Sequence, residues 1–228
     1  MSKKKRHRKK SVPTVEPKPE EGPKKFSIAN LFGWSKLYIS PKKLPDLVTE
    51  LNGKGSLKNS YFYVLVFQIV QLLALALGYL LFHLLTMPVF SSADLVFMLF
   101  IFMVFVVMTV MIFYVRSWLL HFVSGLLGGK TDFGNQTYIL SVLNLCQATI
   151  LFPFLIFAYL SVTGILPVFL STAIALVMVI GELYQLFSFY HVIKGITSLS
   201  SFRSAAVVLV VFVLFSLLST ILPRLMGV

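Results

Sequence analysis

Residues 117–140 read SWLLHFVSGLLGGKTDFGNQTYIL and form the long polar interruption in a chain of apolar runs. Hydrocarbon cannot cover a stretch with this many polar groups and glycines, so it must connect two membrane spans outside the bilayer core. Gly128-Gly129 is typical of a helix end, and residues 132–135 offer turn and capping side chains before the next apolar run. The cationic side chains that mark this side of the membrane are Arg116, His121 and Lys130.

Composition places the chain among membrane proteins with several spans. Hydrophobic residues make up 57% of the sequence and charged residues only 12%, whereas a soluble domain is about 25% charged. The net charge of +12 is uneven, because 15 of the 20 Lys and Arg residues precede Tyr61. Cys146 is the single cysteine, so no disulfide can form within the chain, and its place in an apolar run predicts a small buried or lipid-facing side chain.

Five apolar runs predict an all-α transmembrane bundle over residues 61–228. Each approaches the ~20 residues that a helix needs to cross hydrocarbon, and the expected spans are residues 61–85, 95–119, 138–159, 167–190 and 204–222. The short connections with cations lie on the side of the basic N-terminal segment, whereas the connections at 87–94 and 161–167 have none. This distribution predicts a cytoplasmic N-terminus and, with five spans, an external C-terminus.

Residues 1–25 are a basic block followed by a segment rich in Pro, Glu and Lys, and we expect them to be a disordered cytoplasmic tail. The cations of the block are Lys3, Lys4, Lys5, Arg6, Arg8, Lys9 and Lys10. We expect this block to contact anionic lipid at the cytoplasmic face. Docking to an acidic partner is the alternative, and nucleic acid is disfavoured because no aromatic residues interleave with the charges.

Residues 26–60 predict an amphipathic collar before the first span. The sequence FSIANLFGWSKLY at 26–38 is too short to span a membrane, so we expect it to lie at the interface, with Trp34 and Tyr38 at headgroup depth. Residues 45–51 predict a short helix that ends at Asn52-Gly53.

The rare polar residues within the spans fall at one depth. Three pairs share a helix face through i, i+3 spacing, about 8 to 15 Å below the cytoplasmic surface from the helical rise. They predict a polar layer between the first, third and fourth spans, with Thr109 of the second span at a compatible depth. The candidate polar layer comprises Gln68, Gln71, Thr109, Asn144, Gln147, Glu182 and Gln185. Structural hydrogen bonding is the simplest role. Glu182 carries the functional alternative, because an intramembrane carboxylate is costly unless it is neutral and hydrogen-bonded to Asn144 or Gln147, exchanges protons or binds a cationic group.

Motifs of enzymes are missing from the sequence. It contains no HExxH, GxSxG, GxxxxGK[ST] or GxGxxG. The stretch GGKT at 128–131 lacks the first glycine of a phosphate-binding loop. We therefore expect a protein without enzymatic activity, cofactor or metal.

Several stretches resemble the prokaryotic form of the YIP domain, the family of Rab/Ypt-interacting proteins. They are LLGGKTDF at 126–133 with YILS at 138–141, YISP at 38–41, FYHVIKG at 189–195 and SLSSFRSA at 198–205. The resemblance covers about residues 38–222, and its loop residues are Gly128, Gly129, Lys130 and Phe133. Thr131 departs from the glycine usual in the family, Pro153 lies beyond the usual mid-span position, and the Asp-Leu-Tyr-Gly-Pro signature of eukaryotic members is absent.

The resemblance implies a five-span bundle in a bacterial cell membrane and an accessory role. Some bacterial relatives accompany ABC-type exporters, so the leading hypothesis is an adaptor subunit of a membrane transport assembly, bound to another membrane protein or to itself. Two alternatives stay open. One is a small-solute or proton-coupled transporter that uses the polar layer around Glu182, and the other is a trafficking factor that binds a Rab-type GTPase.

Overall fold

A computed structural model describes residues 27–86 and 92–225. The described chain is all α-helical, which confirms the all-α part of the expected fold. Its seven helices are α1 (Ile28–Ile39), α2 (Leu44–Leu51), α3 (Leu57–Thr86), α4 (Ser92–Leu126), α5 (Phe133–Val162), α6 (Val168–Ile196) and α7 (Ser201–Leu225). The basic block and most of the 87–94 connection lie outside the described residues.

Four helices are long and apolar enough to cross a membrane: α3, α4, α5 and α6. They correspond to the first four predicted spans and define a multi-pass membrane protein. At the end where the 127–132 connection lies, each helix runs four to seven residues beyond its apolar run. Backbone hydrogen bonding continues through polar residues once a helix has formed, so hydropathy underestimates helix length.

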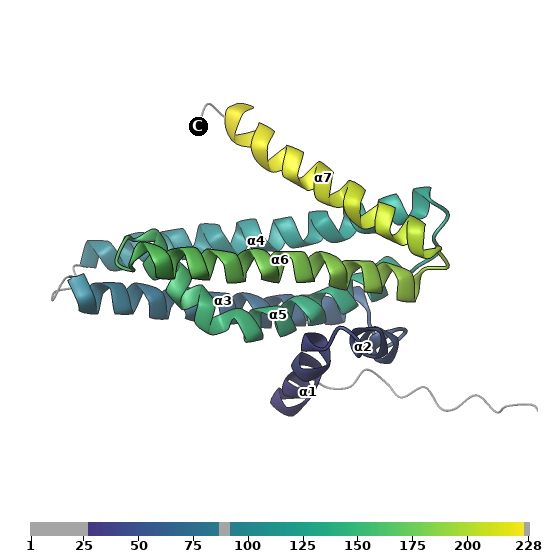
Figure 1. The fold of residues 1–228 in the computed structure, drawn as a ribbon, viewed down its shortest axis with the longest axis horizontal. Coiled ribbons are helices and arrows are strands. Elements are labelled where there is room, and N and C mark those ends of the chain that lie inside the picture. The colour runs from purple at the N-terminus through teal and green to yellow at the C-terminus, as the bar shows by residue number, and fades with distance from the viewer. Residues whose placement is uncertain (1–26, 87–91, 226–228) are drawn as a thin grey trace, which may run out of the picture.

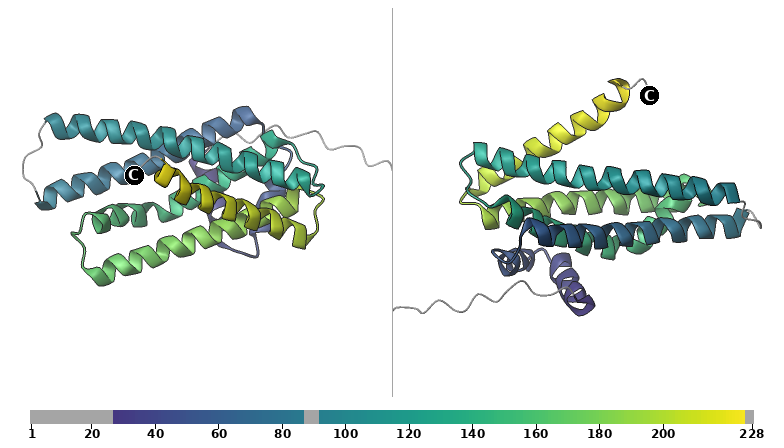
Figure 2. Two further views of the ribbon diagram at one scale, coloured as in Figure 1. Left: turned by 90° about the horizontal axis from the view of Figure 1, so that it is seen from above. Right: turned by 180° about the vertical axis from the view of Figure 1, so that it is seen from behind.

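The fifth predicted span, residues 204–222, falls on α7, which does not join the bundle along its length. Ser204, Val207, Val208 and Val211 are buried at i, i+3, i+4, i+7 spacing against the other helices. Helix α7 is inclined to the bundle on the side of α4 and α6, and it runs away from them toward its C-terminal end (Figures 1 and 2). The fold is therefore a four-helix bundle with a splayed seventh helix. A membrane crossing by α7 and an external C-terminus stay predictions.

The loop at the centre of the 117–140 stretch has specific caps at both ends. Gly128 has φ +87°, its N–H bonds Gly125 O at 3.0 Å, and the Gly129 N–H bonds Ser124 O at 2.8 Å. These two bonds define a Schellman motif, which needs a left-handed residue where glycine is favoured. The Asp132 side chain then caps α5 by accepting from Asn135 N at 2.8 Å. The predicted helix end and helix start are both confirmed.

Helix α5 is the centre of the bundle. Half of its most apolar 18-residue window is buried inside the protein, against 6% in α4 and in α6. Residues 135–148 are buried without interruption, because α1, α3, α4 and α6 all pack against this helix. Cys146 lies in this segment and is fully buried, as the sequence predicts.

The collar helices pack on the bundle, α1 against α5 and α2 against α6. The predicted short helix is confirmed as α2, which ends at the C-cap Asn52. Trp34 and Tyr38 are 4% and 2% exposed, so their rings are buried in the protein and do not face lipid, and their headgroup depth stays a prediction. Their rings pack against protein aromatics because α1 turns this face inward, with Trp34 against Tyr63 and Tyr38 against Tyr184. The apolar side chains that α1 leaves exposed are Ile28, Phe32 and Ile39.

Candidate functional site

A polar pocket of about 200 Å³ lies among α3, α4, α5 and α6. Six of the seven predicted polar-layer residues line it: Gln71, Thr109, Asn144, Gln147, Glu182 and Gln185. The seventh, Gln68, is buried beside it and accepts a hydrogen bond from Thr109 Oγ1 at 2.7 Å. The polar positions therefore gather at one place and involve four helices, whereas their spacing placed the layer chiefly between the first, third and fourth spans. That this cluster acts as a functional site stays a prediction.

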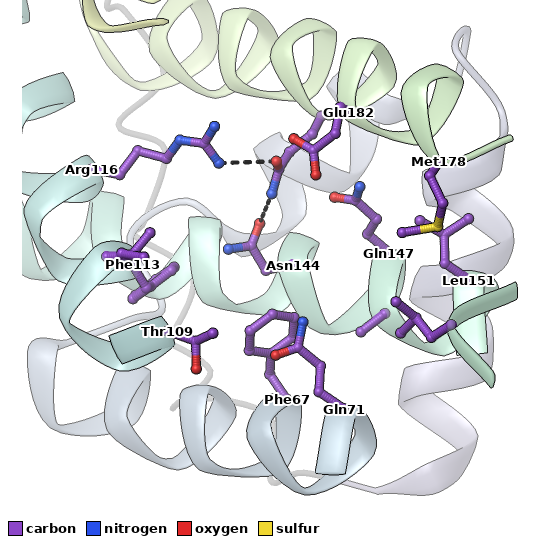
Figure 3. A pocket seen from close by; sticks show the side chains of 14 residues that line it. Phe67, Gln71, Thr109, Phe113, Arg116, Asn144, Gln147, Leu151, Met178 and Glu182 are labelled. Atoms are coloured by element: carbon purple, nitrogen blue, oxygen red, sulfur yellow. Dashed lines mark hydrogen bonds between the residues drawn. The ribbon is translucent and has the colours of Figure 1, made fainter. Parts of the chain in front are cut away.

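Three side chains form a hydrogen-bonded row across the pocket (Figure 3). Arg116 Nη1 on α4 donates to Gln185 Oε1 on α6 at 3.0 Å. The amide nitrogen of Gln185 then donates to Asn144 Oδ1 on α5 at 2.9 Å. The row joins α4 to α6 through side chains, although these two helices are not among the closely packed pairs.

Gln147 forms the wall of the pocket toward α1. Its amide nitrogen donates to Gly181 O on α6 at 3.1 Å, and its Oε1 lies 3.5 Å from the Tyr38 hydroxyl. A side chain at Gly181 would meet Leu151 Cδ1 at 2.9 Å, so the glycine permits the close approach of α5 and α6. The Tyr184 hydroxyl also donates to Tyr38 O. The end of α1 is thereby attached directly behind the pocket.

Glu182 extends its carboxylate into the pocket above Gln147 and Asn144 (Figure 3). The sequence allowed a hydrogen bond from Asn144 or Gln147 to this carboxylate. In the described part of the chain, the Gln147 amide nitrogen donates to Gly181 O instead. Asn144 bonds Gln185 through its oxygen, and no hydrogen bond or ion pair among these residues reaches Glu182. Within the same residues, no three His, Cys, Asp or Glu side chains are grouped as metal ligands.

Arg116 is the pocket residue that sequence reasoning missed, because its place near the end of an apolar run suggested a loop-side cation. Helix α4 continues for ten residues beyond it to Leu126, which is about 15 Å of helix. The guanidinium lies 5.2 Å from the Phe189 ring centroid and 5.4 Å from that of Phe215. One signal was available: Arg116 follows Thr109 by seven residues, or two turns, and so shares its helix face.

The residues of the family-like loop lie at the end of the bundle, and none of them lines the pocket. Gly128 and Gly129 form the α4 cap, and Lys130 is exposed. Phe133 begins α5, where its ring contacts His121 at 5.4 Å. These residues shape the connection between α4 and α5.

The fold and the pocket thus define a class, an α-helical multi-pass membrane protein with a polar intramembrane pocket. Comparison with protein-family models, with curated proteins and with solved structures finds no match. The resemblance to the YIP domain therefore stays a prediction from the residues quoted above.

Proposed function

We propose that this protein is a non-enzymatic accessory subunit that associates within the membrane with a transport assembly such as an ABC-type exporter. The observation that supports the proposal is α7, because this helix is inclined away from α4 and α6 (Figure 1) and exposes several large apolar side chains among its described residues. Leu209, Val213 and Leu217 are 64%, 47% and 50% exposed, and their i, i+4, i+8 spacing places them along one side of the helix. Because α7 is inclined away from the bundle, a partner can pack against two sides of this helix.

Association between membrane helices depends on close packing, because lipid tails are as apolar as leucine. Substitutions that keep the hydropathy but change the shape therefore separate partner contact from lipid contact. Combining Leu209→Phe with Leu217→Phe is expected to reduce co-purification of the transport subunit by about thirtyfold, as two poorly fitting rings would each cost on the order of 1 kcal/mol.

The measurement is quantitative mass spectrometry of what co-purifies with the tagged protein in a mild detergent. The matched control combines Leu73→Phe with Leu81→Phe on α3, where the same spacing lies on a lipid-exposed side of the bundle. We expect the control to retain its partner. Purification of the unmodified protein alone, or only with copies of itself, would contradict the accessory role.

The polar pocket favours a second candidate, a carrier of a small solute or of protons. Glu182 lies in a membrane-spanning helix and faces the pocket, where a carboxylate can exchange a proton or bind a cation. Glu182→Gln is nearly isosteric and separates the two functions. An accessory subunit is expected to keep full export activity of its assembly, whereas a proton-coupled carrier is expected to lose at least about tenfold of its transport rate. Uptake or export assays in cells that lack the chromosomal copy of this gene distinguish the accessory subunit from the carrier.

A further inference from the structure

The pocket contains two opposite charges that are not paired with each other. Arg116 uses one nitrogen for Gln185, and the Glu182 carboxylate receives no hydrogen bond from the described residues. Both side chains line the same pocket, yet they form no ion pair. An apolar surrounding favours direct contact of opposite charges, so a group that fits between them would satisfy both.

The pocket opens sideways toward the membrane between α4 and α6. Ile112 on α4 and Glu182 on α6 both line it, and both are exposed on the outside of the bundle. These helices are not a closely packed pair, and α7 diverges on the same side (Figure 1). A membrane component can therefore reach the pocket from the side of Ile112 and Glu182 without passing through the bundle, whereas the Phe215 ring of α7 lies beside Arg116.

The charged groups differ in position along the bundle. Glu182 lies one helical turn further than Gln185 from the end of α6 that carries Lys194, or about 4.5 Å deeper. Arg116 lies at the level of Gln185, to which it is bonded. Asn144 accepts from Gln185 through its oxygen, which leaves its amide nitrogen as a further donor beside Arg116. The pocket thus presents donors at the shallower level and a carboxylate at the deeper level.

We propose that this pocket binds a phosphoethanolamine group, with its phosphate at Arg116 and Asn144 and its primary ammonium at Glu182. The planar guanidinium matches phosphate geometry through parallel N–H donors, and the carboxylate accepts from the ammonium. The cavity of about 200 Å³ is many times the roughly 10 to 15 Å³ of cavity volume that one water molecule needs. The group lies with its ammonium toward the bilayer centre. This inference does not depend on the accessory role.

The proposal predicts a selective preference among lipids. Phosphatidylglycerol has the phosphate but no cation for Glu182, so the carboxylate repels it. Phosphatidylcholine has a quaternary ammonium that donates no N–H bond and is larger. We expect the full-length protein to retain phosphatidylethanolamine at least about tenfold better than either of the other two lipids. The loss of one charge-assisted hydrogen bond lowers affinity by about this factor.

The test is native mass spectrometry of the protein released from nanodiscs that contain the three lipids in equal amounts with identical acyl chains. Arg116→Gln is expected to lower retention of phosphatidylethanolamine about tenfold, because the phosphate loses its charged donor. Glu182→Gln is expected to abolish the preference over phosphatidylglycerol while total lipid retention stays near that of the unmodified protein. The controls Lys130→Gln and Asp46→Asn remove exposed charges outside the pocket and should change neither quantity.

Equal retention of the three lipids by the unmodified protein overturns the proposal. If Arg116→Gln does not fold, Glu182→Gln decides alone, and an unchanged preference for phosphatidylethanolamine overturns it. Soluble glycerophosphoethanolamine distinguishes the source of the group. Displacement of the lipid by this compound at millimolar concentration supports the binding of a free solute, and retention of the lipid supports a membrane lipid as the occupant.

Discussion

Gly55→Ala is expected to lower the free energy of unfolding by about 3 kcal/mol, the upper part of the range for overpacked positions. A Cβ atom at Gly55 would lie 2.0 Å from Tyr138 Cδ1 and 2.4 Å from Tyr138 Cβ. A change of rotamer cannot relieve the second contact, because the Cβ atom is bonded to the backbone of α5. The Tyr138 ring is also held 5.4 Å from that of Tyr63. The segment between α2 and α3 must therefore shift away from α5.

Thermal or SDS-induced unfolding of the protein in detergent micelles measures this effect. Gly33→Ala is the matched control, because a Cβ atom in the middle of α1 meets nothing within 4 Å. Alanine is the better helix former by up to about 1 kcal/mol, so the control should be slightly more stable than the unmodified protein. Equal stability of the two variants would show that the collar does not press against α5 as described.

Gln185→Leu is expected to destabilise the bundle by about 2 to 3 kcal/mol. The substitution removes the acceptor of the Arg116 guanidinium and the donor to Asn144 together. Hydrogen bonds to charged groups contribute about 1.5 to 3 kcal/mol, more than the average of about 0.6 kcal/mol for interhelical bonds in membranes. The charge on Arg116 accounts for the difference.

Thr109→Val provides the comparison, because it removes a neutral interhelical bond to Gln68 at similar depth. We expect a loss of only about 0.6 kcal/mol from this change. The same unfolding measurements compare the two variants. Equal effects of Gln185→Leu and Thr109→Val would contradict the assignment of Arg116 as a charged member of the row.

Hydropathy and local spacing predicted much of this fold. The first four apolar runs became α3 to α6 because a chain in hydrocarbon must satisfy its backbone hydrogen bonds within each helix. Gly128 and Asp132 predicted the two ends of the α4–α5 connection, since a left-handed residue and a capping side chain have local requirements. The i, i+3 pairs placed the polar side chains on common faces, and six of the seven predicted residues line one pocket.

Long-range packing decided the rest. An apolar side chain in a membrane is equally compatible with lipid and with another helix, so hydropathy could not show that α7 leaves the bundle or that α1 turns Trp34 inward. The position of Arg116 depended on how far α4 extends beyond its apolar run and on which helix faces it. The sequence thus determined which segments are helical and which faces are polar. Only the tertiary contacts placed Arg116 and Glu182 in the same pocket, because they lie on different helices, 66 residues apart in the chain.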